Sequence, residues 1–293
     1  MFVLFTDTDC DFTPKMAKEL NYNLISMPYY ITSSEGDKEV FPYVDFEEFD
    51  GHKFYDDLRH GMVVKTNALN PEVYKEKFEP FFKEGKDILY VHFSAAMSGT
   101  FNSMQLAYKE LKEKYPERNL YEIDTKGITV LSLNIALEVA KLYKDGKSVE
   151  EILAWAKEEV DRFTVYFFAE DLKFFRRSGR VSGLAAFFGT LASIKPLMYM
   201  GNDGKMATVG KVRGRPAAMN ALLQYVEDLG DDLEHHKTIV AHSDAEDVAL
   251  ELEKRLKEKY QDKIDTMVVE INPTIGSHCG PSAVGICFHA KHR

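Results

Sequence analysis

The residues with the clearest capacity for chemistry stand in short polar segments that follow apolar runs. Ser98, Gly99 and Thr100 lie between an apolar run at 87–93 and a segment with helical periodicity. A helix start offers free backbone N–H groups and the positive end of the helix dipole, and the hydroxyl groups add further donors. We interpret this segment as an anion-binding site. The alternative is an ordinary helix N-cap, because Ser and Thr are common at that position anyway.

Two more polar segments have the same character. The sequence KTN at 65–67 precedes Asn70, which is suited to cap the following helix, so Thr66 is free to face a ligand. The sequence NPTIGSHCGP at 272–281 predicts a constrained loop between two strands, in which His278 can donate to an anion. Taken singly, each segment is explained equally well or better as a polar loop or a structural turn.

Basic residues gather in the second half of the chain. The sequence FFRRSGRVS at 174–182 precedes an apolar, glycine-containing run at 183–194. The pair is a candidate lid, a surface for a protein partner, or an edge for transient contact with a membrane. A solvated loop leading to a core helix is the simpler interpretation. Arg213 and Arg215 follow a predicted strand, and either can approach an anion, although such arginines usually pair with surface acids.

Three acidic residues, Asp7, Asp9 and Asp11, follow the first predicted strand, where carboxylates can hold Mg²⁺. The sequence has no P-loop, no GxGxxG and no second carboxylate-rich motif, and no two histidines have a metal-ligand spacing. We therefore expect neither a metal nor a cofactor. We expect Asp7 to bind loop N–H groups and to hold the shape of the site.

The composition limits the possible functions. The 293 residues include 37 basic and 47 acidic side chains, and the net charge of −10 argues against nucleic-acid binding. A DNA-associated regulator is therefore the weakest hypothesis. Three scattered cysteines suit a reducing compartment, the first residues lack the basic region of a signal peptide, and the 183–194 run is too short to span a bilayer. We expect a soluble cytoplasmic protein.

The elements that must position these residues alternate between strands and amphipathic helices. Hydrophobic patterns predict strands at 2–5, 24–31, 87–93, 119–124 and 164–168. Helices are predicted to begin at Thr13-Pro14, Asn70-Pro71, Phe101, Val130 and Ser148. Repeated strand–helix–strand units predict an α/β fold, with a mostly parallel sheet and helices on both of its faces. This N-terminal domain is expected at 1–164, with an inserted excursion at about 32–61.

The second half of the chain predicts a different arrangement. Its expected strands lie at 205–212, 237–242, 264–271 and 284–290, and its expected helices lie at 216–229 and 244–260. We expect residues 165–293 to form a smaller α+β C-terminal domain.

Together and in this order, the motifs resemble those of the DegV family of fatty-acid-binding proteins. They are a TDS-like start at 6–8, a KTS-like element (KTNALNP) at 65–71, SAAMSGT at 94–100, SIKP after the basic loop at 193–196, and GSHCGP at 276–281. The similarity spans nearly the whole chain. The combination of SGT, IKP and GxHxGP makes it specific.

The resemblance implies a bacterial two-domain α/β protein that encloses one long-chain, palmitate-like fatty acid, with its carboxylate between the domains. It assigns carboxylate contacts to Thr66 and Ser98, with His278 and Arg213 assisting. Such proteins are carriers in phospholipid metabolism. They present the acyl group to a separate kinase subunit, which uses ATP to form an acyl phosphate. NALN at 67–70 departs from the Ser-Gln-Pro-Ser that is common in the family, which alters the hydroxyl network around the head group.

The physical chemistry suits a carrier. Burial yields roughly 0.8 kcal/mol per CH₂ group, so a chain of about sixteen carbons gains on the order of 10 kcal/mol before association costs. Hydrogen bonds must offset the removal of the carboxylate from water. The alternative is an acyl-transfer enzyme for a small anionic substrate, with Ser98 as nucleophile and His278 as base. The sequence lacks the GxSxG elbow and a clear third triad member.

Overall fold

The computed structural model describes residues 1–182, 193–261 and 263–293. The first half of the chain contains a four-stranded sheet in the order β2-β1-β6-β7, and every neighbouring pair is parallel. The strands are β1 (Phe2–Asp7), β2 (Tyr22–Ile25), β6 (Asp87–His92) and β7 (Leu120–Asp124). The predicted parallel sheet is therefore confirmed, and the carboxyl ends of its strands lie at one edge.

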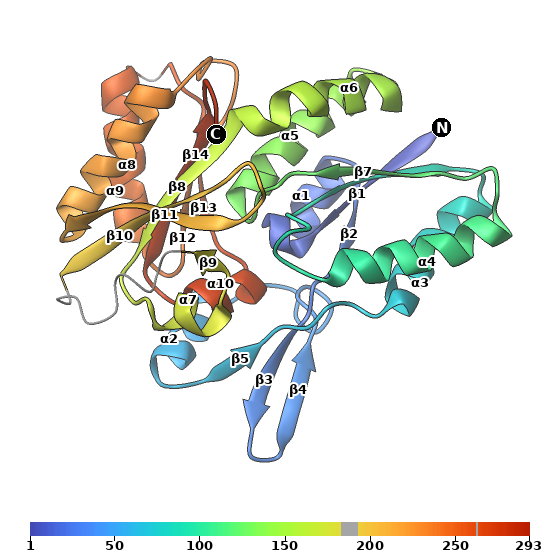
Figure 1. Ribbon diagram of the computed structural model, residues 1–293, viewed down its shortest axis with the longest axis horizontal. Coiled ribbons are helices and arrows are strands. Elements are labelled where there is room, and N and C mark those ends of the chain that lie inside the picture. Colours follow the sequence, from blue (N-terminus) through green and yellow to red (C-terminus); the bar gives the residue numbers. More distant parts are fainter. Residues whose placement is uncertain (183–192, 262) are drawn as a thin grey trace.

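Helices cover both faces of this sheet, as predicted (Figure 1). They are α1 (Pro14–Glu19), α3 (Pro71–Lys83), α4 (Thr100–Lys114), α5 (Val130–Lys144) and α6 (Val149–Glu159). Phe2 and Phe5 are an odd number of residues apart on β1, so their side chains point to opposite faces. The Phe5 ring lies 5.2 Å from Phe78 of α3, and the Phe2 ring lies 5.2 Å from Tyr143 of α5.

Three predicted helix starts have the expected caps. The side chains of Thr13 and Asn70 each accept a hydrogen bond from a backbone N–H in the first turn of α1 and α3, and a proline follows each cap. Ser148 and Glu151 form a reciprocal capping box at the start of α6. These local signals act over three or four residues, which is why the sequence alone predicts them well.

A small antiparallel sheet, in the order β4-β3-β5, projects from the body of the molecule (Figure 1). It consists of β3 (Tyr29–Ser33), β4 (Gly36–Val40) and β5 (Val63–Lys65), and α2 (Gly51–Arg59) lies between β4 and β5 in the chain. The single strand predicted at 24–31 is therefore two strands in different sheets. Pro28 lies between them, and it has no N–H to donate to a strand ladder. The inserted excursion predicted at about 32–61 remains an interpretation of this region.

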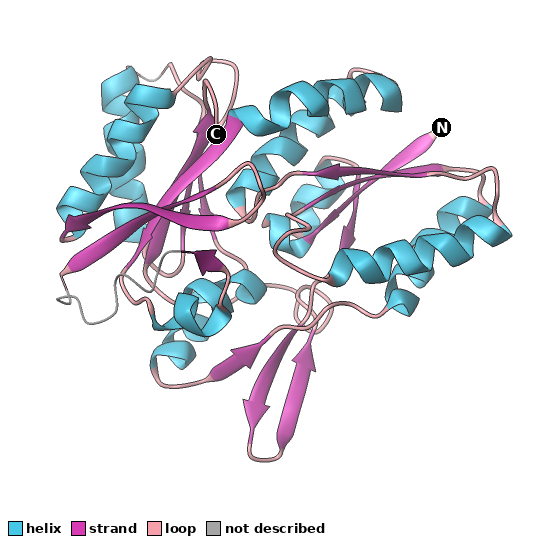
Figure 2. Cartoon of the chain, in the orientation of Figure 1, coloured by secondary structure: helices cyan, strands magenta, loops and turns pink. Residues whose placement is uncertain are grey.

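The second half of the chain forms a mixed seven-stranded sheet in the order β13-β12-β14-β8-β10-β11-β9. Figure 2 shows its strands in magenta, with cyan helices beside them. Its strands are β8 (Phe163–Ala169), β9 (Val181–Ser182), β10 (Ile194–Met200), β11 (Met206–Arg213), β12 (Thr238–His242), β13 (Thr266–Glu270) and β14 (Ala283–His289). The helices are α7 (Lys173–Ser178), α8 (Arg215–Leu229), α9 (Glu246–Tyr260) and α10 (Pro273–Cys279). The sheet begins at Phe163, and a domain boundary near 165 remains a prediction.

The helix α5 lies between the two large sheets. It packs against β8, β12 and β14 of the mixed sheet and against β6 of the parallel sheet. Every residue from Val130 to Ala140 is buried, which confirms the prediction of a helix that is covered on most of its faces. The Tyr22 hydroxyl donates to the Ala136 carbonyl at 2.9 Å, and the Asn134 side chain donates to the Lys237 carbonyl at 2.8 Å.

Two parts of the second half differ from the sequence prediction. The segment 272–281 contains the helix α10 rather than a loop. Asn272 caps this helix, and Gly276 lies where a Cβ would come within 2.3 Å of the Tyr55 hydroxyl. That glycine therefore allows close packing of the helix against Tyr55 and is not part of a chain reversal.

The strand β10 was not predicted from the sequence. Most of the candidate lid at 183–194 lies outside the described residues, and Ile194 is the first residue of β10.

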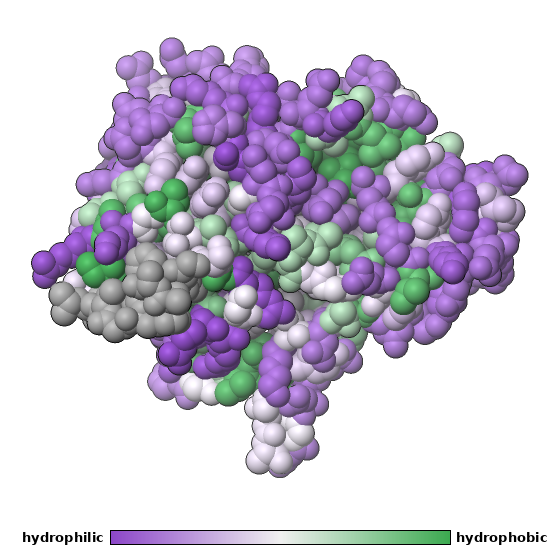
Figure 3. Space-filling model, in the orientation of Figure 1, coloured by the Kyte–Doolittle hydropathy of each residue, from purple (hydrophilic) through white to green (hydrophobic). Residues whose placement is uncertain are grey.

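The surface on the face in Figure 3 is mainly hydrophilic, with smaller hydrophobic patches between the hydrophilic side chains. Within residues 1–182, 193–261 and 263–293, no helix has both the length and the apolar character needed to cross a bilayer.

Candidate functional site

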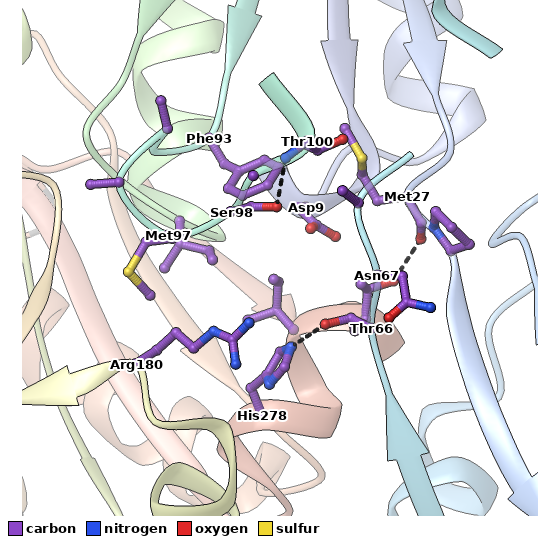
Figure 4. A pocket seen from close by; sticks show the side chains of 18 of the residues that line it. Asp9, Met27, Thr66, Asn67, Phe93, Met97, Ser98, Thr100, Arg180 and His278 are labelled. Atoms are coloured by element: carbon purple, nitrogen blue, oxygen red, sulfur yellow. Dashed lines mark hydrogen bonds between the residues drawn. The ribbon is translucent and has the colours of Figure 1, made fainter. Parts of the chain in front are cut away.

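A cavity of about 440 Å³ lies at the carboxyl edge of the parallel sheet. Asp9 after β1 and Phe93 after β6 form part of its wall, together with segments 66–68 and 95–100. The helix α10 and the side chain of Arg180 lie on the opposite side (Figure 4). Ligands of open α/β sheets bind beyond the carboxyl ends of the strands, and this volume is within the usual range for small-molecule sites.

The hydroxyl group of Thr66 meets the imidazole of His278 at this cavity. Thr66 Oγ1 and His278 Nε2 are 2.8 Å apart, although the two residues are separated by 212 positions in the sequence. Thr66 follows β5, and His278 lies near the end of α10. Both side chains are partly buried and line the cavity (Figure 4). The structure thus brings these two predicted site residues into contact.

Ser98 lines the same cavity, two residues before the start of α4. Its Oγ accepts a hydrogen bond from the Thr100 N–H at 3.2 Å, so its own O–H remains able to donate. The hydroxyl of Thr100, in contrast, is used within the fold. It accepts from the Leu69 N–H at 3.1 Å and lies 2.9 Å from the Tyr74 hydroxyl. Of these two hydroxyl groups, that of Ser98 is the more accessible to a ligand, because that of Thr100 is buried and contacts Leu69 and Tyr74.

Arg213 is not among the residues that line this cavity, and its expected contact with a carboxylate remains a prediction. Met206, the first residue of β11, is part of the wall, whereas Arg213 is the last residue of the same strand. At about 3.3 Å per residue, the two ends are about 23 Å apart. The arginine at the cavity is Arg180, which belongs to the basic segment at 174–182. The clustering of arginines in that segment was the signal in the sequence, but sequence order alone does not show which arginine reaches the site.

The electrostatics of the site favour a neutral histidine. Burial, together with the positive charge of Arg180, lowers the pKa of His278 to about 4. A neutral imidazole donates from one ring nitrogen and accepts at the other. If Nε2 carries the proton and donates to Thr66 Oγ1, the Thr66 O–H is free to donate to an anion in the cavity.

The acidic residues after β1 form a short 3-10 helix, η1 (Thr8–Cys10). Asp7 Oδ1 accepts a hydrogen bond from the Asp9 N–H at 3.0 Å, and Asp7 Oδ2 accepts from the Tyr90 hydroxyl at 3.1 Å. The predicted role of Asp7, binding loop N–H groups, is confirmed. Burial raises the pKa of Asp7 to about 6 and that of Asp11 to about 7. In the described part of the chain, no group of three or more His, Cys, Asp or Glu residues is arranged to hold a metal ion.

A smaller apolar cavity of about 50 Å³ adjoins the first one. Ile128, Met206, Ile275 and His278 line both cavities. The remaining wall of the apolar cavity consists of residues from α5, α7, α10 and the mixed sheet and from the segments beside them, namely Thr129, Val130, Val165, Phe167, Phe175, Ala241, Ile271, Cys279, Ala283, Val284 and Gly285. The combined site is polar at one end and apolar at the other. Its apolar wall was not predicted, because such residues look like ordinary core in the sequence.

The geometry does not support Ser98 as an activated nucleophile. Such a serine needs a base within hydrogen-bond distance. Among the described residues, no hydrogen bond joins Ser98 to His278. The Nε2 atom of His278 is paired with Thr66 instead, and Ser98 is paired with the Thr100 N–H.

Comparison with known proteins gives a consistent family assignment. The family model described as uncharacterised proteins of the DegV family matches residues 1–291. A DegV domain-containing protein of Clostridium perfringens is 34% identical over 289 residues, covering 98% of this chain and 97% of that protein. A DegV domain-containing protein of Lactococcus lactis is 28% identical over 286 residues, covering 97% and 96%.

Solved structures share the fold over almost the whole chain. A DegV family protein from Thermus thermophilus, described by its fatty acid binding, has a TM-score of 0.84 and 24% identity, with 99% of both chains covered. A stearic acid-binding protein from Eubacterium ventriosum has a TM-score of 0.86 and 22% identity, also with 99% of both chains covered. At these identities the structures show the fold alone. The family match over residues 1–291 and the relative with 34% identity show that this chain belongs to the DegV family.

Proposed function

We propose that this chain is a cytoplasmic carrier that binds one long-chain fatty acid and presents its carboxylate to a separate kinase subunit. The observation that carries the proposal is the convergence of Thr66, Ser98 and His278 on one cavity that continues into an apolar one. A stearic acid-binding protein from Eubacterium ventriosum and a DegV family protein from Eubacterium eligens loaded with heptadecanoic acid share this fold and support the same class of ligand.

The head group would be held by hydroxyl donors and a nearby cation. The O–H groups of Thr66 and Ser98 each donate to a carboxylate oxygen, and His278 holds Thr66 in the orientation that this requires. The guanidinium of Arg180 supplies the positive charge. Hydrogen bonds to an ionised group contribute about 1.5–3 kcal/mol each, enough to offset much of the loss of hydration of the carboxylate.

The acyl tail would enter the apolar cavity between α5 and the mixed sheet. The present volume of about 50 Å³ is far below the roughly 300–1,000 Å³ of an ordinary small-molecule site. The wall must therefore move apart to admit a long chain. The side chain best placed to move is that of Met206, because it lines both cavities and is unbranched and flexible.

A phosphoryl donor can reach the proposed head-group position from outside. Asn67, Ala68, Ala95 and Ala96 line the polar cavity and are exposed at the surface, and Arg180 is exposed as well. The carboxylate would therefore lie near the mouth while the tail is enclosed, which is the arrangement that transfer to a kinase requires. With ATP and a candidate kinase subunit, the loaded protein should yield an acyl phosphate that hydroxylamine traps as a hydroxamate.

The proposal also includes transient contact with a membrane surface during loading. Lys173, Arg177 and Arg180 are exposed on and beside α7, and Arg180 lines the cavity. Cationic side chains are attracted to anionic lipids at low ionic strength. Sedimentation with anionic and with neutral vesicles tests this part, and equal recovery with both would contradict it.

The primary experiment identifies the bound lipid. Protein purified from a bacterial host is examined by native mass spectrometry, then stripped of lipid and offered radiolabelled palmitate. We expect one long-chain acid per chain in the first measurement and stoichiometric uptake in the second. Repeated recovery of empty protein that takes up no palmitate after delipidation would contradict fatty acid binding.

A further inference from the structure

Asp9 is a buried acid that faces the polar cavity without a partner for one of its oxygens. Only 4% of its surface is exposed, and it is part of the cavity wall. Its Oδ1 atom has no hydrogen-bond partner among the described residues. Figure 4 shows its carboxyl group at the cavity, on the same side as Ser98. A buried polar atom without a partner costs free energy, so its retention here indicates a partner that is bound from outside the chain.

The backbone holds Asp9 firmly in this position. Its N–H donates to Asp7 Oδ1 at 3.0 Å, and its carbonyl accepts from the Thr129 N–H at 2.9 Å. Thr129 has a φ of +51°, which is rare for a β-branched residue. The turn that presents the Asp9 side chain to the cavity is therefore anchored to both β1 and the start of α5.

An ionised Asp9 would repel the carboxylate of a fatty acid in the same cavity, whereas a protonated Asp9 can donate to it. We propose, on the basis of the function proposed above, that Asp9 is protonated in the complex and donates its O–H to the ligand carboxylate, so that the two carboxyl groups share one proton. The unpartnered oxygen then gains its hydrogen bond, and no two negative charges meet in a buried space. Two carboxyl groups at close range generally behave in this way.

The surroundings of Asp9 favour the neutral form. Burial, followed by the negative charges of Asp7 and Asp11, raises the pKa of Asp9 well above its usual value. The other titratable or charged groups near this turn are Cys10 in η1, Tyr74 in α3, Tyr90 and His92 in β6, Arg180 before β9, and His278 in α10. His278 is neutral above about pH 4 in the absence of ligand, since burial and the positive charge of Arg180 lower its pKa.

The inference predicts that binding depends on pH in a defined direction. Below the pKa of Asp9 the proton is already present, so affinity is constant. Above that pKa the protein must take up a proton in order to bind, and affinity falls by up to about tenfold per pH unit. The carboxyl group of a free fatty acid is ionised throughout this range, so the ligand itself adds no slope.

The test measures the dissociation constant of dodecanoate between about pH 6 and about pH 9 for wild type, Asp9→Asn and His278→Gln. Asparagine donates a hydrogen bond but does not titrate, so Asp9→Asn should bind with a flat profile and should exceed the affinity of wild type by up to about tenfold for each pH unit above the pKa of Asp9. His278→Gln should bind more weakly overall but keep the wild-type slope. Calorimetry of wild type and His278→Gln in two buffers of different ionisation enthalpy should show proton uptake at any pH above the pKa of Asp9, even if Asp9→Asn does not fold. Infrared spectroscopy of the wild-type complex should show the band of a protonated carboxyl group that Asp9→Asn lacks.

The outcomes separate this inference from the function on which it rests. If wild type binds no dodecanoate or palmitate at any pH, the proposed function is wrong. If infrared spectroscopy of the wild-type complex shows no protonated carboxyl band that Asp9→Asn lacks, the shared proton is wrong and fatty acid binding stands. If the slope disappears in His278→Gln and persists in Asp9→Asn, the proton belongs to the histidine, which also overturns the inference.

Discussion

Removing the Thr66 hydroxyl should weaken both ligand binding and one contact between distant parts of the chain. Thr66→Val keeps the shape of the side chain but loses Oγ1, which lies 2.8 Å from His278 Nε2. A hydrogen bond to an ionised group contributes about 1.5–3 kcal/mol, which corresponds to a dissociation constant that is about 10–150-fold higher. The imidazole also loses its partner, so the free energy of unfolding should fall by about 1 kcal/mol. Displacement of a fluorescent fatty acid measures the first effect, and urea denaturation measures the second.

Two control variants define the result. Thr66→Ser keeps the hydroxyl and should bind within about threefold of wild type, because less than about 0.7 kcal/mol is at stake. Thr32→Val removes a buried hydroxyl whose Oγ1 has no hydrogen-bond partner in the described part of the chain, so neither affinity nor stability should fall. If Thr66→Val is folded and binds as tightly as wild type, the assignment of Thr66 to the head group is refuted.

Three further predictions concern stability and the tail site. Gly280 has a φ of +70°, and a Cβ there would lie 2.1 Å from the Phe174 ring. Gly280→Ala should therefore lower the free energy of unfolding, measured by urea denaturation, by about 2–5 kcal/mol. The control is Gly85→Ala, where φ is +75° but the surrounding space is open, and its free energy of unfolding should fall by only about 1 kcal/mol. Because the pKa of Asp11 is raised from 3.8 to about 7, the folded state retains its proton longer than the unfolded state, so stability falls as pH rises between these values. Asp11→Asn should flatten that fall, and an unchanged slope would contradict the role of Asp11. Ala283→Leu narrows the apolar cavity and should weaken binding of long-chain acids while sparing short ones, as a chain-length series in the displacement assay would show.

The sequence predicts local features of this fold better than long-range ones. Caps such as Thr13 and Asn70 involve neighbouring residues only, and the alternation of strands and helices suffices for the parallel sheet. The strand order of the mixed sheet and the strand β10 depend on partners far along the chain. The helix α10 was missed because two glycines and two prolines suggested a loop, whereas Gly276 is needed for contact with Tyr55.

The candidate site shows the same division. Thr66, Ser98 and His278 were chosen from their motifs, and the fold places all three at one cavity. Arg213 was chosen in the same way, but it lies at the far end of β11, and Arg180 is at the cavity instead. The position of Asp9 at the wall of the cavity depends on parts of the chain that meet only after folding. No pattern of neighbouring residues therefore distinguishes Asp9 from Asp7 and Asp11.

The helix α5 has a consequence for how the molecule assembles and unfolds. Since its buried residues face the parallel sheet on one side and the mixed sheet on the other, neither half of the chain provides a complete interior by itself. A fragment ending near residue 160 would expose the apolar residues of α5 to water. The remaining C-terminal fragment would expose the face of the mixed sheet that α5 covers in the intact chain. The halves, made as separate polypeptides, should be poorly soluble alone and should regain structure when mixed. Melting of the intact chain should follow a single transition.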